Sequence, residues 1–589
     1  MHLRRLPAGD RRTAPGRVLG KFVRLLVVSV CLSPALAAGD ISGSVLDADD
    51  LLGIPGARVH VQADPDGPVA ITDAAGDFTL PVDPTGSVVL TAALPYDAGS
   101  SPNYPIEQRN AANGDTGVLF LLQKIPASDA PGYQPPTPEN GCEVCHAEQV
   151  QQWQGSHHAG AAVNEWVLDL FSGTGTPGGD NGYVFTETHD PGETGFCATC
   201  HTPLADVFDP GNVMLDEVTQ DGALAGVQCL ACHQIDAVNN NVAALAHLGN
   251  SSYRFPDQAP TQFFVWGPLD DVGFATMEAL YAPYMKESRF CASCHEYDNP
   301  DTGAPGQTTY SEWLASPYAQ PGPEFRSCQN CHMPAADEPG PISSLGGQPV
   351  RPPEQRHSHE FIGTTPQTLA DAIDLQLEVE RDGNALVITA VVGNDAGHAF
   401  PTGVSIRNAL LHITAEAGGQ PLPQTGGGTL PFYASDEVPG EQPGDLAGAP
   451  GAGFARVLEG RINGTGATVA PVLFIDAESV QSDTRIPSGA SHTSEYRFDI
   501  AGQPPGSEAT VTAEVLWRRA FRKIVVNKGW TESARGGPIE IVAASRQASV
   551  AVGGDALPVA IPALGPGAVA LLFLLLVATA GWRLSVRDV

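Results

Sequence analysis

The sequence predicts a multidomain protein. It begins with an antiparallel β-sandwich, continues through a mainly α-helical and irregular middle domain, and ends in a second antiparallel β-sandwich and a single transmembrane segment. Residues 40–125 and 366–555 alternate apolar and polar side chains between Gly, Pro and Asp turns, which is typical of antiparallel strands. Ten of the eleven cysteines lie between these two regions. Residues 564–582 form 19 uncharged, mostly apolar positions, long enough to cross a bilayer.

Residues 1–38 have the pattern of a secretory signal peptide. They contain seven basic residues and one acidic residue, then an apolar run that ends in small residues such as Ala35 and Ala38. The alternative is an uncleaved anchor, although Arg24 lies inside the apolar run. Cys31 would be removed with a cleaved signal peptide. Both interpretations predict export of the remaining chain.

The first β-rich region, 40–125, resembles carboxypeptidase-regulatory-like domains. The residues that carry the resemblance are Gly43, Val45, Asp47, Pro55, Gly56, Ala57, Val59, Val61, Thr72, Asp73, Gly76, Phe78 and Leu80. Such domains are usually spacers or adhesion modules rather than catalysts, and the resemblance implies that role here. Residues 126–140 are rich in proline, which predicts an extended linker.

Five C-x-x-C-H motifs follow the linker. Their cysteines are Cys142 and Cys145, Cys197 and Cys200, Cys229 and Cys232, Cys291 and Cys294, and Cys328 and Cys331; their histidines are His146, His201, His233, His295 and His332. This is the attachment pattern of c-type haem, in which two thiols bind the porphyrin and the next histidine binds the iron. Disulfides require no histidine after each second cysteine, and zinc requires two such half-sites to converge. The sequence therefore predicts five covalently bound haem c groups.

The haem domain is predicted to span 141–365. So short a region cannot bury a large side-chain core around five haems, and its strand and helix patterns are weak. We therefore expect the porphyrins themselves to form the core, wrapped by short helices and long irregular connections. The motif histidines are the predicted proximal iron ligands.

Each iron is expected to bind a second, distal imidazole, and five groups of histidines outside the motifs match that demand. The predicted distal ligands are His158, His189, His247, His359 and His398; His157 and His357 are alternatives adjacent to two of them. His398 lies in the third domain, on a loop where the preceding glycine lets the backbone approach a flat macrocycle. The β-sandwich of residues 366–555 is therefore a possible source of a distal ligand, and its first two strands are expected to meet at a hairpin turn over 381–384.

The motif-bearing region resembles the multihaem c-type cytochromes related to the tetrahaem cytochromes of ammonia oxidation. The resemblance covers roughly residues 140–405. It rests on Trp153, Ser156, His158, Tyr310, Trp313, Ser316, Tyr318, Met333, Pro334, His359, His398, Pro401, Thr402 and Gly403. It implies mostly electron carriers with two histidines at most haems, and some reductases and oxidases.

A repeated segment raises a question about Tyr318. Shifted by 160 positions, Trp153 aligns with Trp313 and Ser156 with Ser316, but His158 aligns with Tyr318. In one interpretation the tyrosine packs against a porphyrin and binds a propionate. In the other, one iron keeps an open face with Tyr318 beside it. The supply of other histidines favours the packing role.

The C-terminal residues 561–589 resemble the IPTL-type sorting signals of bacteria. An Ile-Pro-x-Leu lead precedes the apolar span, and Arg583 and Arg587 follow it. The resemblance implies recognition by a sorting enzyme and delivery to the cell surface. The alternative is a permanent single-span anchor, with the arginines on the cytoplasmic side. Both place the body of the protein in the periplasm or at the cell surface.

The formal charge of −35 argues against binding to nucleic acid or acidic lipid. Without residues 1–38 the charge becomes −41. We expect an exported electron carrier with no catalytic residues, whose partners are redox proteins or quinol-linked donors. The second hypothesis is a multihaem oxidoreductase that acts on a small nitrogen or sulfur compound at one open haem. A third is a surface adhesin whose haems are incidental.

Overall fold

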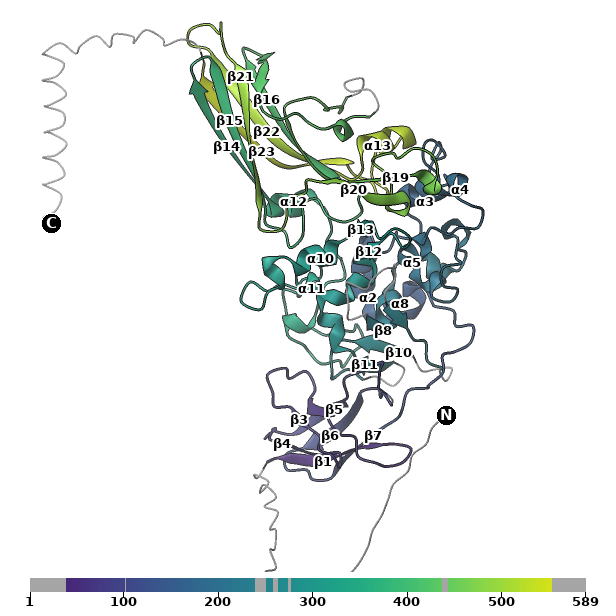
Figure 1. Cartoon of the computed structure of the whole chain (residues 1–589). Helices are drawn as coiled ribbons and strands as arrows, with labels where there is room; N and C mark the ends of the chain where they lie inside the picture. The colour runs from purple at the N-terminus through teal and green to yellow at the C-terminus, as the bar shows by residue number, and fades with distance from the viewer. Residues whose placement is uncertain are drawn as a thin grey trace, which may run out of the picture.

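The computed structural model describes residues 39–100, 102–238, 251–257, 263–273, 277–436 and 443–552. Three units follow one another along the molecule: an N-terminal β unit, a middle region of short helices and a C-terminal β unit (Figure 1). The predicted signal peptide 1–38, the predicted span 561–589 and His247 lie outside the described residues. Within the described ranges, no helix has the length and apolar character needed to cross a membrane.

The N-terminal unit consists of two sheets that share one apolar core. Its strands are β1 (Ile41–Asp47), β2 (Arg58–Val61), β3 (Ala70–Ile71), β4 (Asp77–Leu80), β5 (Ser87–Ala93), β6 (Glu107–Ala112) and β7 (Val118–Leu122). One sheet has the order β4-β1-β7 and the other β3-β2-β5-β6. Fully buried Val45, Leu90 and Phe120 belong to the shared core. The prediction of a purely antiparallel unit was wrong in one place, because β1 and β7 pair in parallel.

The middle region contains short elements and only small apolar clusters. Its helices are α1 (Pro138–Gly141), α2 (Glu143–Gly155), α3 (Glu165–Phe171), α4 (Phe185–Thr188), α5 (Cys197–His201), α6 (Pro203–Asp206), α7 (Asp221–Leu224), α8 (Cys229–His233), α9 (Ala292–His295), α10 (Thr309–Leu314) and α11 (Cys328–His332). Its strands form three pairs: β8 (Ile235–Val238) with β9 (Ser251–Tyr253), β10 (Phe264–Gly267) with β11 (Glu278–Tyr281), and β12 (Tyr297–Asp298) with β13 (Pro305–Gln307). This sparse side-chain core agrees with the expectation that a prosthetic group supplies much of the packing.

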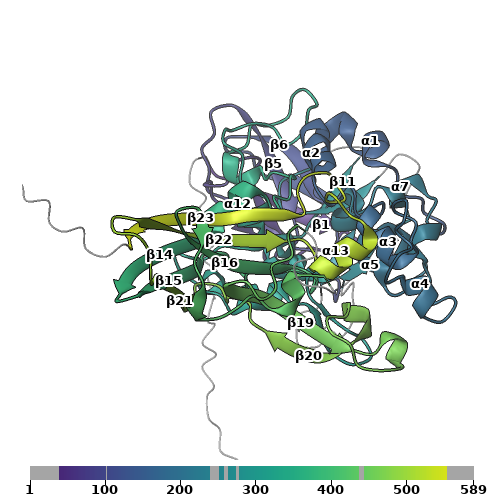
Figure 2. The ribbon, with the colours of Figure 1, turned by 90° about the horizontal axis from the view of Figure 1, so that it is seen from above.

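The C-terminal unit is a pair of antiparallel sheets over the largest apolar core. Its elements are α12 (Pro366–Ala372), β14 (Ile373–Asp382), β15 (Ala385–Asn394), β16 (Asn408–Ala417), β17 (Gln420–Pro421), β18 (Gln424–Gly426), β19 (Gly451–Gly460), β20 (Ala477–Asp483), β21 (Ser491–Asp499), β22 (Glu508–Arg518), α13 (Arg522–Lys528) and β23 (Glu540–Ala551). The sheet orders are β14-β15-β21-β18 and β20-β19-β16-β22-β23, and the long strands of both sheets run side by side (Figure 2). The predicted hairpin is confirmed: Asp382 pairs with Ala385 across Gly383, whose φ of +61° suits glycine.

Two sets of polar contacts join the units. On the N-terminal side, Asp271 binds buried Arg351 at 2.8 Å and accepts a hydrogen bond from the Ala63 backbone at 2.7 Å. On the C-terminal side, Trp530 stacks on Trp166 at 4.1 Å and donates its indole N–H to buried Asp169 at 2.7 Å. The β unit at the C-terminus is therefore in direct contact with the helices that precede the second motif.

Candidate haem centres

Each C-x-x-C-H motif lies at a short helical turn. Helices α5, α8 and α11 span their motifs, whereas α2 and α9 begin one residue after the first cysteine. Residues three apart on a helix share a face, so both thiols of a motif lie on the same side. All ten of these thiols are free and none is fully buried. This arrangement suits covalent attachment of a planar group beside each turn.

The five proximal imidazoles are oriented in one common way. In every motif the Nδ1 atom has a partner: Ile342 O at 2.9 Å for His146, Ala161 O at 3.0 Å for His201, Trp266 O at 2.7 Å for His233, Gln307 Nε2 at 2.9 Å for His295 and Ile362 O at 2.5 Å for His332. A carbonyl partner fixes the tautomer in which Nδ1 carries the proton and Nε2 is free to bind a metal. Four of the five motifs have such a carbonyl, and the side-chain amide of Gln307 orients the fifth imidazole.

Two predicted distal histidines face proximal ones at the spacing that a shared metal ion requires. The ring centroids of His158 and His295 are 6.3 Å apart, and those of His332 and His398 are 6.4 Å apart with planes only 11° from parallel. Two imidazoles that bind one metal, each through a bond of about 2 Å, have centroids about 6 Å apart. The residues present therefore fit haem iron at the fourth and fifth motifs.

Burial keeps these imidazoles neutral. It is the largest cause that lowers the pKa of His158 to about 3 and the pKa values of His295 and His359 to about 4. Burial also lowers the pKa of His398. A neutral imidazole with an available ring nitrogen is the form that binds iron, so the electrostatics agree with the geometry.

The repeated sequence segment is also a structural repeat. The Trp153 indole donates to the Val227 carbonyl and the Trp313 indole to the Arg326 carbonyl, both at 2.8 Å. Val227 and Arg326 each lie two residues before a motif, the third and the fifth. Their backbone N–H groups in turn donate to the carbonyls of His158 and Tyr318, at 3.1 and 3.0 Å respectively. Each copy therefore positions the helix of a later motif in the same way.

The residue before each tryptophan holds a loop that carries a distal histidine. Gln152 accepts a hydrogen bond from the backbone N–H of His359 at 2.8 Å. Glu312, its counterpart in the second copy, accepts one from Ala399, next to His398, at 3.2 Å. His398 faces the motif histidine His332 of the fifth motif, and by the repeat His359 corresponds to the third motif. In agreement, the charge of His233 is, after burial, the largest cause that lowers the pKa of His359.

Tyr318 fastens the loop that carries His398. Its hydroxyl donates to the Asp395 carbonyl at 2.9 Å, and its ring lies against Gly397. In the second copy of the repeat, the side chain at this position therefore contacts the loop of His398, and a tyrosine stands where the first copy has His158. This agrees with a packing role, in which the hydroxyl binds a backbone carbonyl.

His189 lies in a different environment from the other predicted ligands. Its Nε2 is 3.1 Å from the carboxylate of buried Asp476, and its Nδ1 is 3.2 Å from the Phe185 carbonyl. Tyr183 also donates to Asp476, at 2.9 Å. Both ring nitrogens are therefore engaged. Among the described residues, no imidazole faces His146 or His201 at the spacing of the two pairs above.

The attachment sites form one contiguous group. Three pairs of cysteines from different motifs lie next to each other: Cys142 with Cys229, Cys200 with Cys294, and Cys291 with Cys328. In each pair the neighbouring thiol is the largest cause of the raised pKa of Cys229, Cys200 or Cys291. The charge of Cys294, after burial, also raises the pKa of Cys232. The third motif thus adjoins the first and the fourth, and the fourth adjoins the second and the fifth.

Sequence reasoning missed the side chains that position the ligands. Gln307, Gln152 and Glu312 orient His295, His359 and His398 respectively. The last two could have been found, because they occupy equivalent places in the repeat. Gln307 carries no such signal, since its role depends on the pairing of β12 with β13 beside α9.

The family described as cytochrome c554 and c-prime matches residues 141–234, which hold the first three motifs. The penta-heme cytochrome c552 from Thermochromatium tepidum is 19% identical, over 70% of this chain and 99% of that chain, with a TM-score of 0.49. MtrC from Shewanella baltica OS185 is 10% identical, over 88% of this chain and 69% of that chain, with a TM-score of 0.12. No curated protein matches.

The family match covers a minor part of the chain but falls on the motifs themselves. The remaining two motifs have the same helical setting, and their histidines form the imidazole pairs. Over its first three motifs, the middle region of this chain is similar to the family of cytochrome c554 and c-prime.

Proposed function

We propose that this chain is an exported five-haem c-type cytochrome that transfers electrons at the bacterial cell envelope. The contiguity of the five attachment sites carries the proposal, because redox groups must lie close together to exchange electrons. Bound haem iron supplies a one-electron couple whose potential depends on axial ligands, hydrogen bonds and burial. In this proposal the chain binds that iron through all five motif histidines.

The proposal assigns three distal ligands. His158 binds opposite His295 and His398 opposite His332, as the centroid spacings favour. His359 binds opposite His233, on the strength of the repeat. The ligands opposite His146 and His201 are unassigned; His189 and His247 remain predictions for these positions.

The cellular setting is part of the proposal. The basic and apolar pattern of residues 1–38 supports export, and that of residues 561–589 supports anchoring in, or sorting through, the membrane. The strong negative charge favours redox proteins with cationic docking surfaces as partners, with quinol-linked donors as another source of electrons.

A redox titration followed by visible absorption tests the proposal. The protein, produced with a c-type maturation system, should take up five electrons per chain reversibly and exchange them with an electrode. Low-spin spectra in both oxidation states are expected for every haem with two imidazoles. A protein that holds haem but gives no electrode response would contradict electron transfer and favour an adhesin.

One observation favours a second function, an oxidoreductase that uses the haem at Cys197 and Cys200. His189, the nearest predicted ligand in sequence, has both ring nitrogens engaged by Asp476 and Phe185. With His189 held in this way, iron bound at His201 would keep a free coordination position, where a small nitrogen or sulfur compound can bind.

Cyanide and nitrite titrations of the oxidised protein distinguish the two functions. A pure carrier with two ligands at every iron gives spectra that neither anion alters. A high-spin fraction of one haem in five that binds these anions supports the oxidoreductase, and turnover of nitrite or hydroxylamine would establish it.

A further inference from the structure

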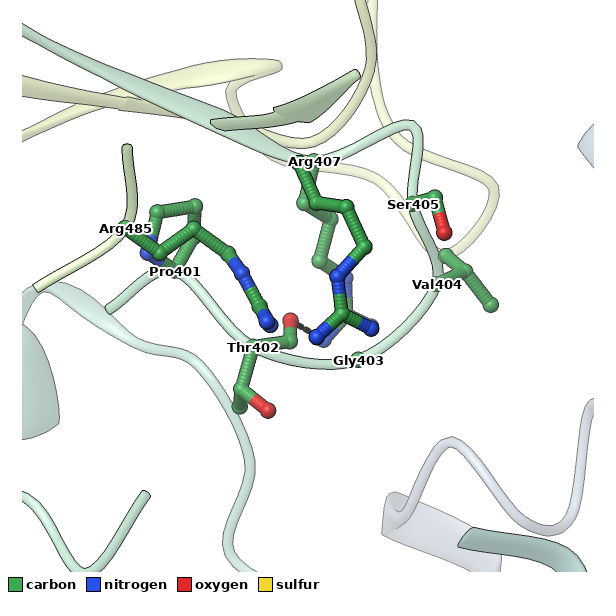
Figure 3. A pocket seen from close by; sticks show the side chains of 8 residues that line it. Pro401, Thr402, Gly403, Val404, Ser405, Arg407 and Arg485 are labelled. Atoms are coloured by element: carbon green, nitrogen blue, oxygen red, sulfur yellow. Dashed lines mark hydrogen bonds between the residues drawn. The ribbon is translucent and has the colours of Figure 1, made fainter. Parts of the chain in front are cut away.

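The guanidinium of Arg407 lies inside a tight loop of residues 401–405 (Figure 3). Its Nη1 donates to the Thr402 carbonyl at 3.2 Å. The loop can fold this closely because Gly403 has a φ of +92° and no side chain: a Cβ atom there would lie 2.4 Å from Nη1. The Pro401-Thr402-Gly403 segment therefore forms a close-fitting site for this one guanidinium.

Two other arginines line the same pocket, and both have acidic partners. Arg485 binds Glu312 at 2.5 Å and Asp483 at 2.8 Å. Arg456 binds Asp483 at 3.0 Å. Among the described residues, no carboxylate lies within ion-pair distance of Arg407, whose one hydrogen bond goes to the Thr402 carbonyl.

A second arginine, Arg519, lies nearby and also has no carboxylate partner within the part of the chain that the structure describes. Arg519 lies over the Trp517 ring at 5.2 Å, and Arg407 lies over the same ring at 5.9 Å. The hydrogen bond of Arg519 goes to the Pro538 carbonyl. Burial, followed by the charge of Arg519, lowers the pKa of Arg407 to about 10. Two neighbouring cations that pair with no carboxylate of the described ranges form a place where an anion binds favourably.

The loop that holds this guanidinium lies near the proposed ligands of two haem centres. The Thr402 hydroxyl is 3.1 Å from that of Thr309, which accepts a hydrogen bond from Gln307, the partner of His295. Glu312 accepts hydrogen bonds from Thr402 and from the backbone of Ala399, next to His398. After burial and His332, the charge of Arg407 is among the causes that lower the pKa values of His295 and His398. These histidines are the proximal ligand of the fourth motif and the distal ligand that faces the fifth. An anion held by Arg407 would therefore lie beside these two centres.

We propose that Arg407, assisted by Arg519, binds a propionate carboxylate of the haem pair attached at Cys291–Cys294 and Cys328–Cys331. The inference rests on the proposed haem attachment. Arginine is suited to the role, because its planar fork of donors matches a carboxylate with two parallel hydrogen bonds and it stays charged when buried. The fixed positive charge then offsets the negative propionate, and this favours the reduced state of the nearby iron.

Substitution of Arg407 by Gln tests the proposal through reduction potentials rather than activity. With five haems retained, at least one of the five midpoint potentials should fall by an amount equal to roughly a tenfold change in the equilibrium constant, or about 59 mV for one electron. In Arg407→Lys, which keeps the positive charge but loses the paired donors of the guanidinium, the same midpoint potential should fall less. Arg519→Gln should produce a smaller fall in the same potential.

Arg518→Gln is the matched control. Arg518 is buried, precedes Arg519 in the sequence and pairs with Glu540 at 2.6 Å. Its loss should therefore lower the stability of the protein and leave all five potentials unchanged. Unchanged potentials in an Arg407→Gln protein that retains five haems would overturn the proposal. If Arg407→Gln fails to fold, Arg519→Gln and Arg407→Lys test the proposal in its place: a smaller fall in one potential supports it, and unchanged potentials overturn it.

A free anion from solution is the competing occupant. Addition of phosphate or sulfate to the unsubstituted protein, at constant ionic strength, should leave the potentials unchanged if a propionate holds the site. A shift that matches the Arg407→Gln effect would overturn the propionate assignment. A protein without covalent haem would instead contradict the proposed function, so the two failures are distinguishable.

Discussion

At the residue scale, His398 is the proposed second protein ligand of the iron at His332. The two rings are nearly parallel and correctly spaced for one metal ion. His398→Ala should therefore convert one haem in five from low to high spin, which absorption and electron paramagnetic resonance spectra of the oxidised protein would measure. The control is His412→Ala on β16, which should leave the spectra unchanged. A fully low-spin His398→Ala protein would show that this pairing is wrong.

Tyr318 supplies the second prediction at this scale. Tyr318→Phe removes one hydrogen bond, to the Asp395 carbonyl, and leaves the ring in place. The free energy of unfolding should fall by about 1 kcal/mol, the usual value of such a bond. Chemical denaturation measures the change, and the spectra should not alter. New binding of cyanide or nitrite by the variant would instead place the phenol beside an open iron.

At the scale of elements, α2 and α10 perform the same task in two places. Each presents a tryptophan to the residues before a later motif and a polar side chain to a loop that carries a predicted distal histidine. The sequence revealed this repeat through Trp153 and Trp313, and it also predicted the hairpin of β14 and β15. It could not reveal the loops held by Gln152 and Glu312, because those partners are 207 and 87 residues away.

The anchoring function of α10 predicts the effect of Glu312→Gln. The carboxylate accepts from Thr402 at 2.6 Å and pairs with Arg485. Loss of its charge leaves that arginine less well compensated and should lower the free energy of unfolding by about 1–3 kcal/mol. The haem that His398 serves should also become partly high-spin. Glu378→Gln, on an exposed part of β14, is the control and should change neither quantity.

If Glu312→Gln destabilises the protein but leaves every haem low-spin, the carboxylate contributes to packing alone. The same comparison with Gln152→Ala would examine the first copy of the repeat. There the distal loop carries His359, so the affected haem should be a different one, with its own midpoint potential.

At the scale of the whole molecule, the N-terminal β unit contacts the haem region through Asp270. Arg58 binds this carboxylate at 2.7 Å, and His60 approaches it at 3.2 Å. Burial opposes protonation of His60, but the hydrogen bond and charge of Asp270 raise its pKa overall. The pKa of Asp270 is correspondingly lowered, against the effect of its own burial, by His60 and Arg58.

This contact predicts a pH dependence. Because the pKa of His60 is higher in the folded protein than its ordinary value of 6.5, protonation of His60 stabilises the folded state. This stabilisation is complete at pH values below 6.5 and disappears as the pH rises through the pKa of the folded protein. The contact should therefore weaken by about 1 kcal/mol between pH 6 and pH 9. Limited proteolysis between the first two units at several pH values measures this. His60→Gln should abolish the dependence, whereas persistence of the dependence in that variant would assign it to another group.

The parts of the fold that the sequence could predict are those encoded locally. The five motifs, their helical turns and the alternating strands each depend on residues close together in the chain. The parallel pairing of β1 with β7, which departed from expectation, depends on segments far apart. So does the contact of His189 with Asp476, which no local pattern indicated. The loop of His398 was indicated locally by the glycine before it, and the role of His398 as an iron ligand stays a prediction.

A pyridine haemochrome assay, normalised to protein concentration after acid–acetone extraction, tests the central claim most directly. Thioether bonds at the five motifs should retain the haem through extraction, so we expect five haems per chain in the protein fraction. A colourless protein fraction, or haem that passes entirely into the acetone, would contradict covalent attachment and the function built on it.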